Sequence, residues 1–203
     1  TRSTGITMIT NALGILFSPH STWQRLAAVA DRASNLLPIL ILAVLPAVAW
    51  YYGTTHMGWT VGSGEVTKFA RSGGIALGAA LYVGLVAWVC IIGWSIHWMA
   101  TSYGAQSTLM RGITVAGFTA VPMLIAGVVG FNPVPSIVMV VGLASAGWSL
   151  YLLYIGIPAV MHVPEDRGFL FASAVVAVCL VILVGMMGAG VILWDTFSPE
   201  FTI

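Results

Sequence analysis

Charged side chains are scarce in this chain of 203 residues, because they make up only 6% of it, whereas hydrophobic residues make up 59%. A soluble domain carries about 25% charged residues, since its surface must face water. So few charges cannot cover a water-facing surface, and most of the chain must therefore be solvated by lipid. The formal net charge of +1 supplies no bulk field that favours nucleic acid, and no nucleic-acid partner is expected.

Cysteine is also scarce, with Cys90 and Cys179 as the two examples. Both lie deep in apolar runs, without a neighbouring Cys or His at the spacing of metal ligands. We interpret them as packing thiols rather than as a disulfide or a metal pair. The nine methionines show no repeated pair spacing, so we interpret them as gap fillers rather than soft-metal ligands. The sequence therefore predicts no metal and no cofactor.

Catalytic motifs and charges within the apolar runs are missing as well. The chain has no GxSxG, HExxH or GK[ST] motif and no paired-carboxylate site, so no catalytic residue is expected and an enzyme is disfavoured. Its long apolar runs contain no Asp, Glu, Lys or Arg. Such residues usually mark proton relays and ion-coupled transport, and their absence disfavours a secondary transporter.

His97 is the one histidine inside these runs, near the end of the second. A ligand role for it needs partners such as His162, Met99 or Met161. We favour the alternative, in which the imidazole forms a hydrogen bond to a hydroxyl or a carbonyl near the lipid headgroups.

What the chain does contain is five apolar runs long enough to cross a bilayer, at residues 36–52, 73–101, 112–131, 136–161 and 169–194. A tight Asn132-Pro133-Val134-Pro135 turn separates the third run from the fourth. Residues 1–35 precede the spans and residues 195–203 follow them as a short tail. The sequence therefore predicts an all-α polytopic membrane bundle.

Proline and small residues predict how these helices bend and pack. Pro122 leaves the Phe118 carbonyl without its helical donor, so we expect a kink repaired by a neighbouring hydroxyl or by local 3₁₀ geometry. Small residues line several spans and allow close helix contact in lipid. We expect most of them to pack within one bundle, although a homo-oligomer is compatible with those that remain. They include Gly74, Gly78, Gly112, Gly117, Gly127, Gly130, Gly142, Ser145, Gly185 and Gly188.

Residues 1–35 predict two short helices that lie in the membrane interface. Ser18-Pro19 is typical of an N-cap followed by a first-turn proline. In the helix that follows, Trp23 and its apolar neighbours form one face, and Arg25 and Arg32, seven residues apart, form the other. Trp23 would anchor this helix at the headgroups while the arginines attract anionic lipid. The alternative, a helix packed on the bundle's own loops, stays open.

The arginines and lysines predict an orientation. With a cytoplasmic N-terminus, five basic residues lie on the inner side and two, Lys68 and Arg71, on the outer side. Five spans then place the C-terminus outside. The inner residues are Arg2, Arg25, Arg32, Arg111 and Arg167. Arg167, with Arg111 and Arg32 on the same side, is expected to form a basic and polar rim suited to anionic lipid headgroups.

Four segments resemble motifs of the Yip1-domain family. The run from Gly117 to Pro122 resembles the Gly-aromatic-x-x-x-Pro motif of the family's third span, with Phe118 as the aromatic residue. Residues 148–156 resemble the fourth span, including Tyr151, Tyr154 and Gly156. Residues 17–27 and 51–59 resemble the family's bacterial N-terminal segment and first external loop. The Asp-Leu-Tyr-Gly-Pro motif of eukaryotic members is absent, so Rab-type partnering is not implied.

The resemblance implies a multi-pass protein of the bacterial inner membrane. We expect a non-enzymatic protein that organises membrane or binds lipid or membrane-protein partners. The alternative is a small permease or channel for a neutral or lipidic solute, which would use the prolines and hydroxyls of the bent spans. These are Pro46, Pro122, Pro158, Ser149, Tyr151 and Tyr154.

Overall fold

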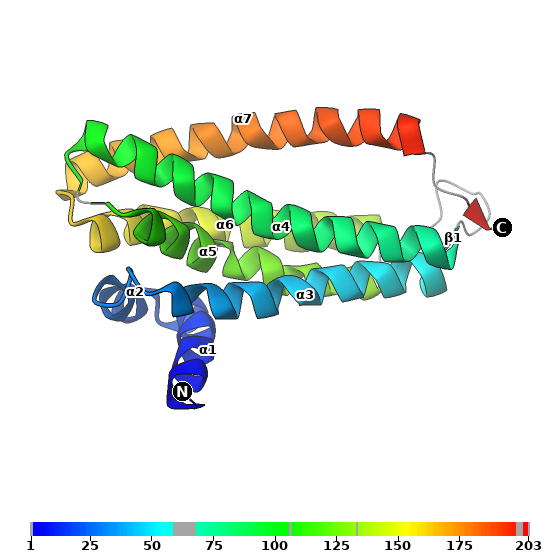
Figure 1. Ribbon diagram of the computed structural model, residues 1–203, viewed down its shortest axis with the longest axis horizontal. Helices are drawn as coiled ribbons and strands as arrows, with labels where there is room; N and C mark the ends of the chain where they lie inside the picture. The colour runs from blue at the N-terminus through cyan, green and yellow to red at the C-terminus, as the bar shows by residue number, and fades with distance from the viewer. Residues whose placement is uncertain (1, 59–67, 106, 133, 198–200, 203) are drawn as a thin grey trace.

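The computed structural model describes residues 2–58, 68–105, 107–132, 134–197 and 201–202, which form an elongated helical bundle (Figure 1). Within these residues, five helices are long and apolar enough to cross a membrane, with lengths of 20 to 33 residues. A membrane helix needs about 20 apolar residues to cross a hydrocarbon layer about 30 Å thick. The predicted all-α polytopic fold is confirmed.

The spans follow two short N-terminal helices. In chain order the helices are α1 (Arg2–Phe17), α2 (Pro19–Ala27), η1 (Ala33–Asn35), α3 (Leu36–Tyr52), η2 (Gly53–Met57), α4 (Arg71–Ala100), η3 (Thr101–Tyr103), α5 (Leu109–Ala126), η4 (Gly127–Phe131), α6 (Pro135–Met161) and α7 (Glu165–Phe197). The α3 helix covers the first predicted span, and the third predicted span ends where η4 ends, at Phe131. The other bounds lie within about four residues of the predicted ones.

Two short strands lie at the end of the bundle opposite α1. Strand β1 (Lys68–Phe69) pairs antiparallel with β2 (Phe201–Thr202). Residues 195–197 belong to α7, so the segment predicted as a short tail is partly helix and partly strand. The two ends of the chain lie at opposite ends of the bundle, as an odd number of spans requires (Figure 1).

The α5 helix is the most buried of the five spans. Small residues let its neighbours approach: a Cβ placed on Gly93 of α4 would lie 2.6 Å from the Ile113 Cα. A Cβ on Gly117 would overlap Ile39 of α3, and one on Gly127 would overlap Pro46. Van der Waals contact of this kind is a main source of helix association in lipid.

The other predicted small-residue ridges divide into two groups. Gly74 and Gly78 pack against Tyr51 and Ala47 within the bundle. A Cβ on Gly142 of α6 or on Gly185 or Gly188 of α7 would meet nothing within 4 Å. The small residues therefore bring α3, α4 and α5 together but leave these faces of α6 and α7 open.

The predicted repair at Pro122 is wrong. The α5 helix continues as α-helix through Pro122 to Ala126, and 3₁₀ geometry begins only at Gly127. None of the side-chain hydrogen bonds found in the described residues ends on the Phe118 carbonyl. Phe118 and Val121 are fully buried here, and Pro122 is buried beside them.

The N-terminal helices lie across the bundle rather than along it (Figure 1). Helix α2 starts at Pro19 with Ser18 as its N-cap, as predicted, but it ends at Ala27. The chain then turns, and Arg32 has extended backbone with φ −84° and ψ 127°. Arg25 and Arg32 therefore do not share one helical face, and that prediction is wrong. The turn is closed by hydrogen bonds from Val29 N to Leu26 O and from Arg32 N to Val29 O.

Candidate functional site

Two motif residues, Phe118 of α5 and Gly156 of α6, form the site where Trp23 of α2 packs; we call this site the Trp23 seat. Trp23 is 1% exposed, and its indole makes an edge contact with Phe118 at a centroid distance of 6.5 Å. A Cβ on Gly156 of α6 would lie 2.6 Å from Trp23 Cζ2, so only glycine leaves room for the ring. Trp23 therefore packs in the protein core, and the prediction that it anchors α2 in lipid is wrong. The open alternative named the loops of the bundle, whereas the contacts of Trp23 are with Phe118 of the α5 helix and Gly156 of the α6 helix.

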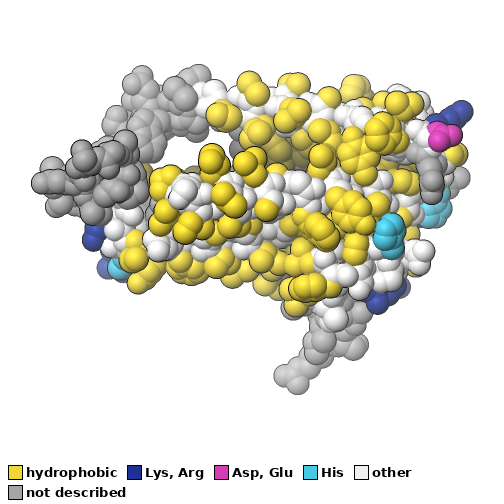
Figure 2. Space-filling model, turned by 180° about the vertical axis from the view of Figure 1, so that it is seen from behind, with side chains coloured by type: hydrophobic (Ala, Val, Ile, Leu, Met, Phe, Trp, Pro, Cys, Tyr) yellow, Lys and Arg dark blue, Asp and Glu magenta, His cyan; other side chains and the backbone are white. Residues whose placement is uncertain are grey.

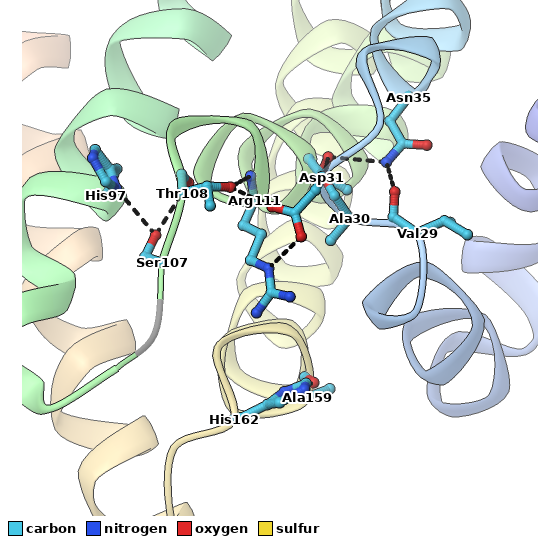
Figure 3. A network of polar contacts seen from close by, with 11 residues as sticks. Val29, Ala30, Asp31, Asn35, His97, Ser107, Thr108, Arg111, Ala159 and His162 are labelled. Atoms are coloured by element: carbon cyan, nitrogen blue, oxygen red, sulfur yellow. Dashed lines mark hydrogen bonds and ion pairs between the residues drawn. The ribbon is translucent and has the colours of Figure 1, made fainter.

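An ion pair fastens the turn after α2 to the start of α5 (Figure 3). Arg111 Nε donates to Asp31 Oδ2 at 3.0 Å, and the Thr108 hydroxyl donates to the other carboxylate oxygen. Thr108 is also the N-cap of α5, since its side chain accepts a bond from Arg111 N. The hydrogen bond from the Thr108 hydroxyl is the main cause that lowers the pKa of Asp31 from its usual 3.8. Burial opposes it, and the hydrogen bond and charge of Arg111 add smaller lowering effects.

A second, buried group of hydrogen bonds supports the same turn (Figure 3). Asn35 Nδ2 donates to Val29 O at 2.9 Å and to Thr114 Oγ1 at 3.2 Å. The Thr114 hydroxyl in turn donates to Ala30 O at 2.9 Å. Both polar side chains are almost fully buried. Because a buried polar group is costly when left unpaired, this group fixes the turn in one position on α5.

His97 takes the role that we favoured from the sequence. Its Nδ1 lies 3.3 Å from Ser107 Oγ, and the Ser107 hydroxyl donates to Thr108 O. His162 bonds within its own helix end instead, with Nδ1 3.2 Å from Ala159 O (Figure 3). In the described part of the chain, no group of three or more His, Cys, Asp or Glu residues is arranged to hold a metal ion.

The two motif tyrosines lie at the same end of the bundle. Tyr151 OH is 3.4 Å from His20 Nε2 of α2, and Tyr154 OH is 2.9 Å from Ser173 Oγ of α7. Tyr154 also lines an open pocket of about 910 Å³ between α2, α6 and α7, together with His20 and Asp166. The tyrosines thus join α6 to α2 and α7 beside this pocket.

The four predicted lipid-contact arginines have different surroundings. Arg25 is exposed on α2 and donates to Thr22 Oγ1 at 3.0 Å. Arg32 and Arg167 are exposed, whereas Arg111 is more enclosed and bonds to Asp31. Arg25, Arg32 and Arg167 can therefore face headgroups, while Arg111 joins two parts of the chain.

Sequence reasoning missed the partners on which this end of the bundle depends. It gave no role to Asp31 or to Asn35. It also did not single out Phe17, which is 85% exposed at the corner between α1 and α2. The available signal was that Asp31 and Arg111 lie on the same predicted side of the membrane, which permits an ion pair.

The distribution of polar and apolar side chains over the surface is that expected of a helical bundle that spans a membrane. On the face shown in Figure 2, charged and histidine side chains lie at the two ends, and the length between them is largely hydrophobic. Exposed apolar side chains such as Val83, Leu143 and Val181 extend along the spans. These features define a polytopic integral membrane protein with a polar, helix-covered end.

Comparison with known proteins gives the family. Residues 13–186 match the Yip1 domain, and the chain belongs to the Yip1 domain family. It is 31% identical over 156 residues to the inner membrane protein YohC of Escherichia coli strain K12, across 77% of this chain and 80% of that protein. YohC of Escherichia coli O6:H1 strain CFT073 matches with the same identity and coverage. No solved structure matches the chain significantly.

Proposed function

We propose that this chain is a non-enzymatic protein of the bacterial inner membrane that organises the membrane by binding anionic lipid at its α1–α2 end. The observation that supports this best is that α2 is fixed across the end of the bundle. Trp23 is seated against Gly156, and Asp31 of the following turn bonds to Arg111. Membrane lipids are the proposed partners, and a second copy or another membrane protein is compatible with the open faces of α6 and α7.

The fixed helices present both kinds of group that a membrane surface binds. Ala12 and Ile15 of α1 are buried against the bundle, while Leu13 and Phe17 are 48% and 85% exposed. On a helix that lies in the membrane interface, exposed apolar side chains such as these enter the boundary between headgroups and acyl chains. Arg25 and Arg32 lie exposed nearby in the chain, where each surface arginine adds about 1 kcal/mol of attraction to anionic lipid. In this proposal α1 and α2 form a rigid surface that binds lipid, rather than a helix that inserts into the membrane and leaves it again.

The identity of the relative and the charge distribution both support the location and orientation. The similar Escherichia coli protein is named an inner membrane protein. Five basic residues belong to the N-terminal side of the bundle and two to the other side. The positive-inside rule then favours a cytoplasmic N-terminus and an exterior C-terminus.

Lipid retention in nanodiscs tests this function. Discs of equal parts phosphatidylglycerol and phosphatidylcholine are assembled, and the lipids that stay on the protein are measured by native mass spectrometry. The wild type should retain phosphatidylglycerol preferentially. Arg25→Gln with Arg32→Gln should reduce that preference about thirtyfold, because two arginines contribute about 2 kcal/mol.

The matched control is Arg71→Gln, since Arg71 is an exposed first residue of α4 at the opposite end of the bundle. It should leave the preference at the α2 end unchanged. A double variant that keeps the wild-type preference would show that this end does not bind anionic lipid.

A second candidate is a small permease for a neutral or lipidic solute. The 910 Å³ pocket supports it, because Tyr154 and Pro158, two residues expected along such a path, line its wall. The test is uptake of a neutral solute such as glycerol into vesicles. A permease requires uptake faster than in empty vesicles and a loss of that uptake in Ala159→Trp, which narrows the pocket.

A further inference from the structure

A second cavity lies inside the membrane-spanning part, among α4, α5, α6 and α7. Its volume is about 220 Å³, and its wall is mostly apolar. Two polar residues belong to this wall. Thr119 lies near the middle of the span formed by α5 and η4, and Ser149 lies near the middle of α6. Met123, Leu150 and Leu180 also line it and are themselves exposed, so the cavity opens to the lipid-facing surface.

Two hydroxyls in this wall lack a hydrogen-bond partner. Thr119 Oγ1 and Ser149 Oγ are both buried atoms that form no hydrogen bond with the described residues. The Ser149 residue is only 8% exposed. A hydroxyl on a membrane helix usually bonds back to the carbonyl one turn earlier, as Ser95 does to Ile91 O at 2.9 Å. An unpaired buried hydroxyl is costly, so these two are free to bond a ligand.

Depth and charge restrict what the ligand can be. Phospholipid headgroups and their ester oxygens lie at the edges of a hydrocarbon layer about 30 Å thick, far from the middle of the spans. The residues that line the cavity include no Asp, Glu, Lys, Arg or His. A charged ligand would therefore be buried without a counter-ion, which is unfavourable. The chemistry fits an uncharged, lipid-soluble molecule with an oxygen that accepts hydrogen bonds.

The size and shape of the cavity further restrict what the ligand can be. An apolar protein cavity of about 150 Å³ is large enough to bind benzene. The cavity here is larger, at about 220 Å³, and Trp88 lines it, so it offers an aromatic side chain that packs well against a flat ring. We propose that the cavity binds a benzoquinone-type ring, with Thr119 and Ser149 donating hydrogen bonds to its carbonyl oxygens. Its hydrocarbon tail leaves through the opening beside Met123 and Leu180.

This inference goes beyond the proposed function, because the cavity is distinct from the basic end of the bundle. The proposal is for binding only and involves no electron transfer. Either site can fail its test without affecting the other, since Arg25 and Arg32 do not line this cavity.

Equilibrium binding of a radiolabelled decyl-tailed benzoquinone tests the site. The full chain is reconstituted in phosphatidylcholine vesicles, and partitioning into empty vesicles is subtracted. One saturable site per chain is expected. Thr119→Val and Ser149→Ala should each raise Kd about fivefold or more, because each removes one hydrogen bond. Decylbenzene, which has the ring and tail without carbonyls, should compete poorly.

Ser145→Ala is the matched control. Ser145 lies one turn before Ser149 on α6, but its hydroxyl bonds to Gly142 O at 2.9 Å. This variant should bind as the wild type does. Binding that is not saturable, or wild-type Kd in the Thr119→Val, Ser149→Ala double variant, would overturn the proposal.

Two further measurements separate loss of binding from loss of folding. Removing an unpaired hydroxyl should keep or raise Tm in the absence of quinone, so both variants are expected to fold. Ala146 lines the cavity and is itself exposed. Ala146→Leu should therefore block the site without adding bulk to the core. If this folded variant bound the quinone as tightly as the wild type, the ligand would lie elsewhere and the proposal would fail.

Discussion

The close packing of Trp23 against Gly156 predicts that a larger residue at position 156 destabilises the protein. A methyl group at this position would lie 2.6 Å from Trp23 Cζ2, closer than carbon atoms approach. The indole cannot retreat easily, because it is 1% exposed and also contacts Phe118. Gly156→Ala should therefore displace α2 from the bundle or strain the packing around it.

Two effects set the size of the change. Inserting a methyl group into a packed core costs about 1–3 kcal/mol. Replacing a helical glycine by alanine stabilises by about 0.5–1 kcal/mol. The net result for Gly156→Ala should be a loss of about 1–2 kcal/mol. Gly142→Ala on the same helix should instead be neutral or stabilising, because its methyl group would meet nothing within 4 Å.

Thermal unfolding in detergent and hydrogen exchange across Pro19–Ala27 measure both effects. Gly156→Ala should lower Tm and speed exchange in α2, while Gly142→Ala should do neither. Trp23→Leu should restore part of the loss when it is combined with Gly156→Ala, since the smaller side chain makes room. Equal Tm and equal α2 protection for the two alanine variants would refute the reasoning, because the seat would then tolerate a Cβ.

The remaining predictions concern charge. Because the folded pKa of Asp31 is lowered, its contribution to stability is present above its ordinary value of 3.8 and is lost as pH falls through the folded value. Asp31→Asn should therefore remove this part of the acid dependence of unfolding. The contribution to the free energy of unfolding is about 1 kcal/mol or less, because the ion pair is exposed. An unchanged acid sensitivity of unfolding would contradict this prediction. Reporter fusions after Phe131 and at Ile203 should both report the exterior, and a cytoplasmic signal at Ile203 would reverse the orientation.

Motif recognition located part of the candidate site without explaining it. Gly117, Phe118 and Gly156 stood out as family-like positions, and the structure shows that they hold Ile39 and Trp23 at close range. Pro122 stood out in the same way, but its effect on the helix could not be derived from its missing N–H alone. The α5 helix continues through Pro122 among buried neighbours such as Phe118 and Val121, and those tertiary contacts cannot be derived from the proline.

The sequence by itself determined the spans, since the length and polarity of a run decide whether it can cross a bilayer. It also determined where α2 begins, because Ser18-Pro19 acts locally. Only the tertiary structure decided what the apolar face of α2 contacts. Lipid tails and a protein core are equally apolar, so a pattern with Trp23 on one face suits either solvent. The pairing of Asp31 with Arg111, 80 residues apart, was likewise decided by how the helices meet.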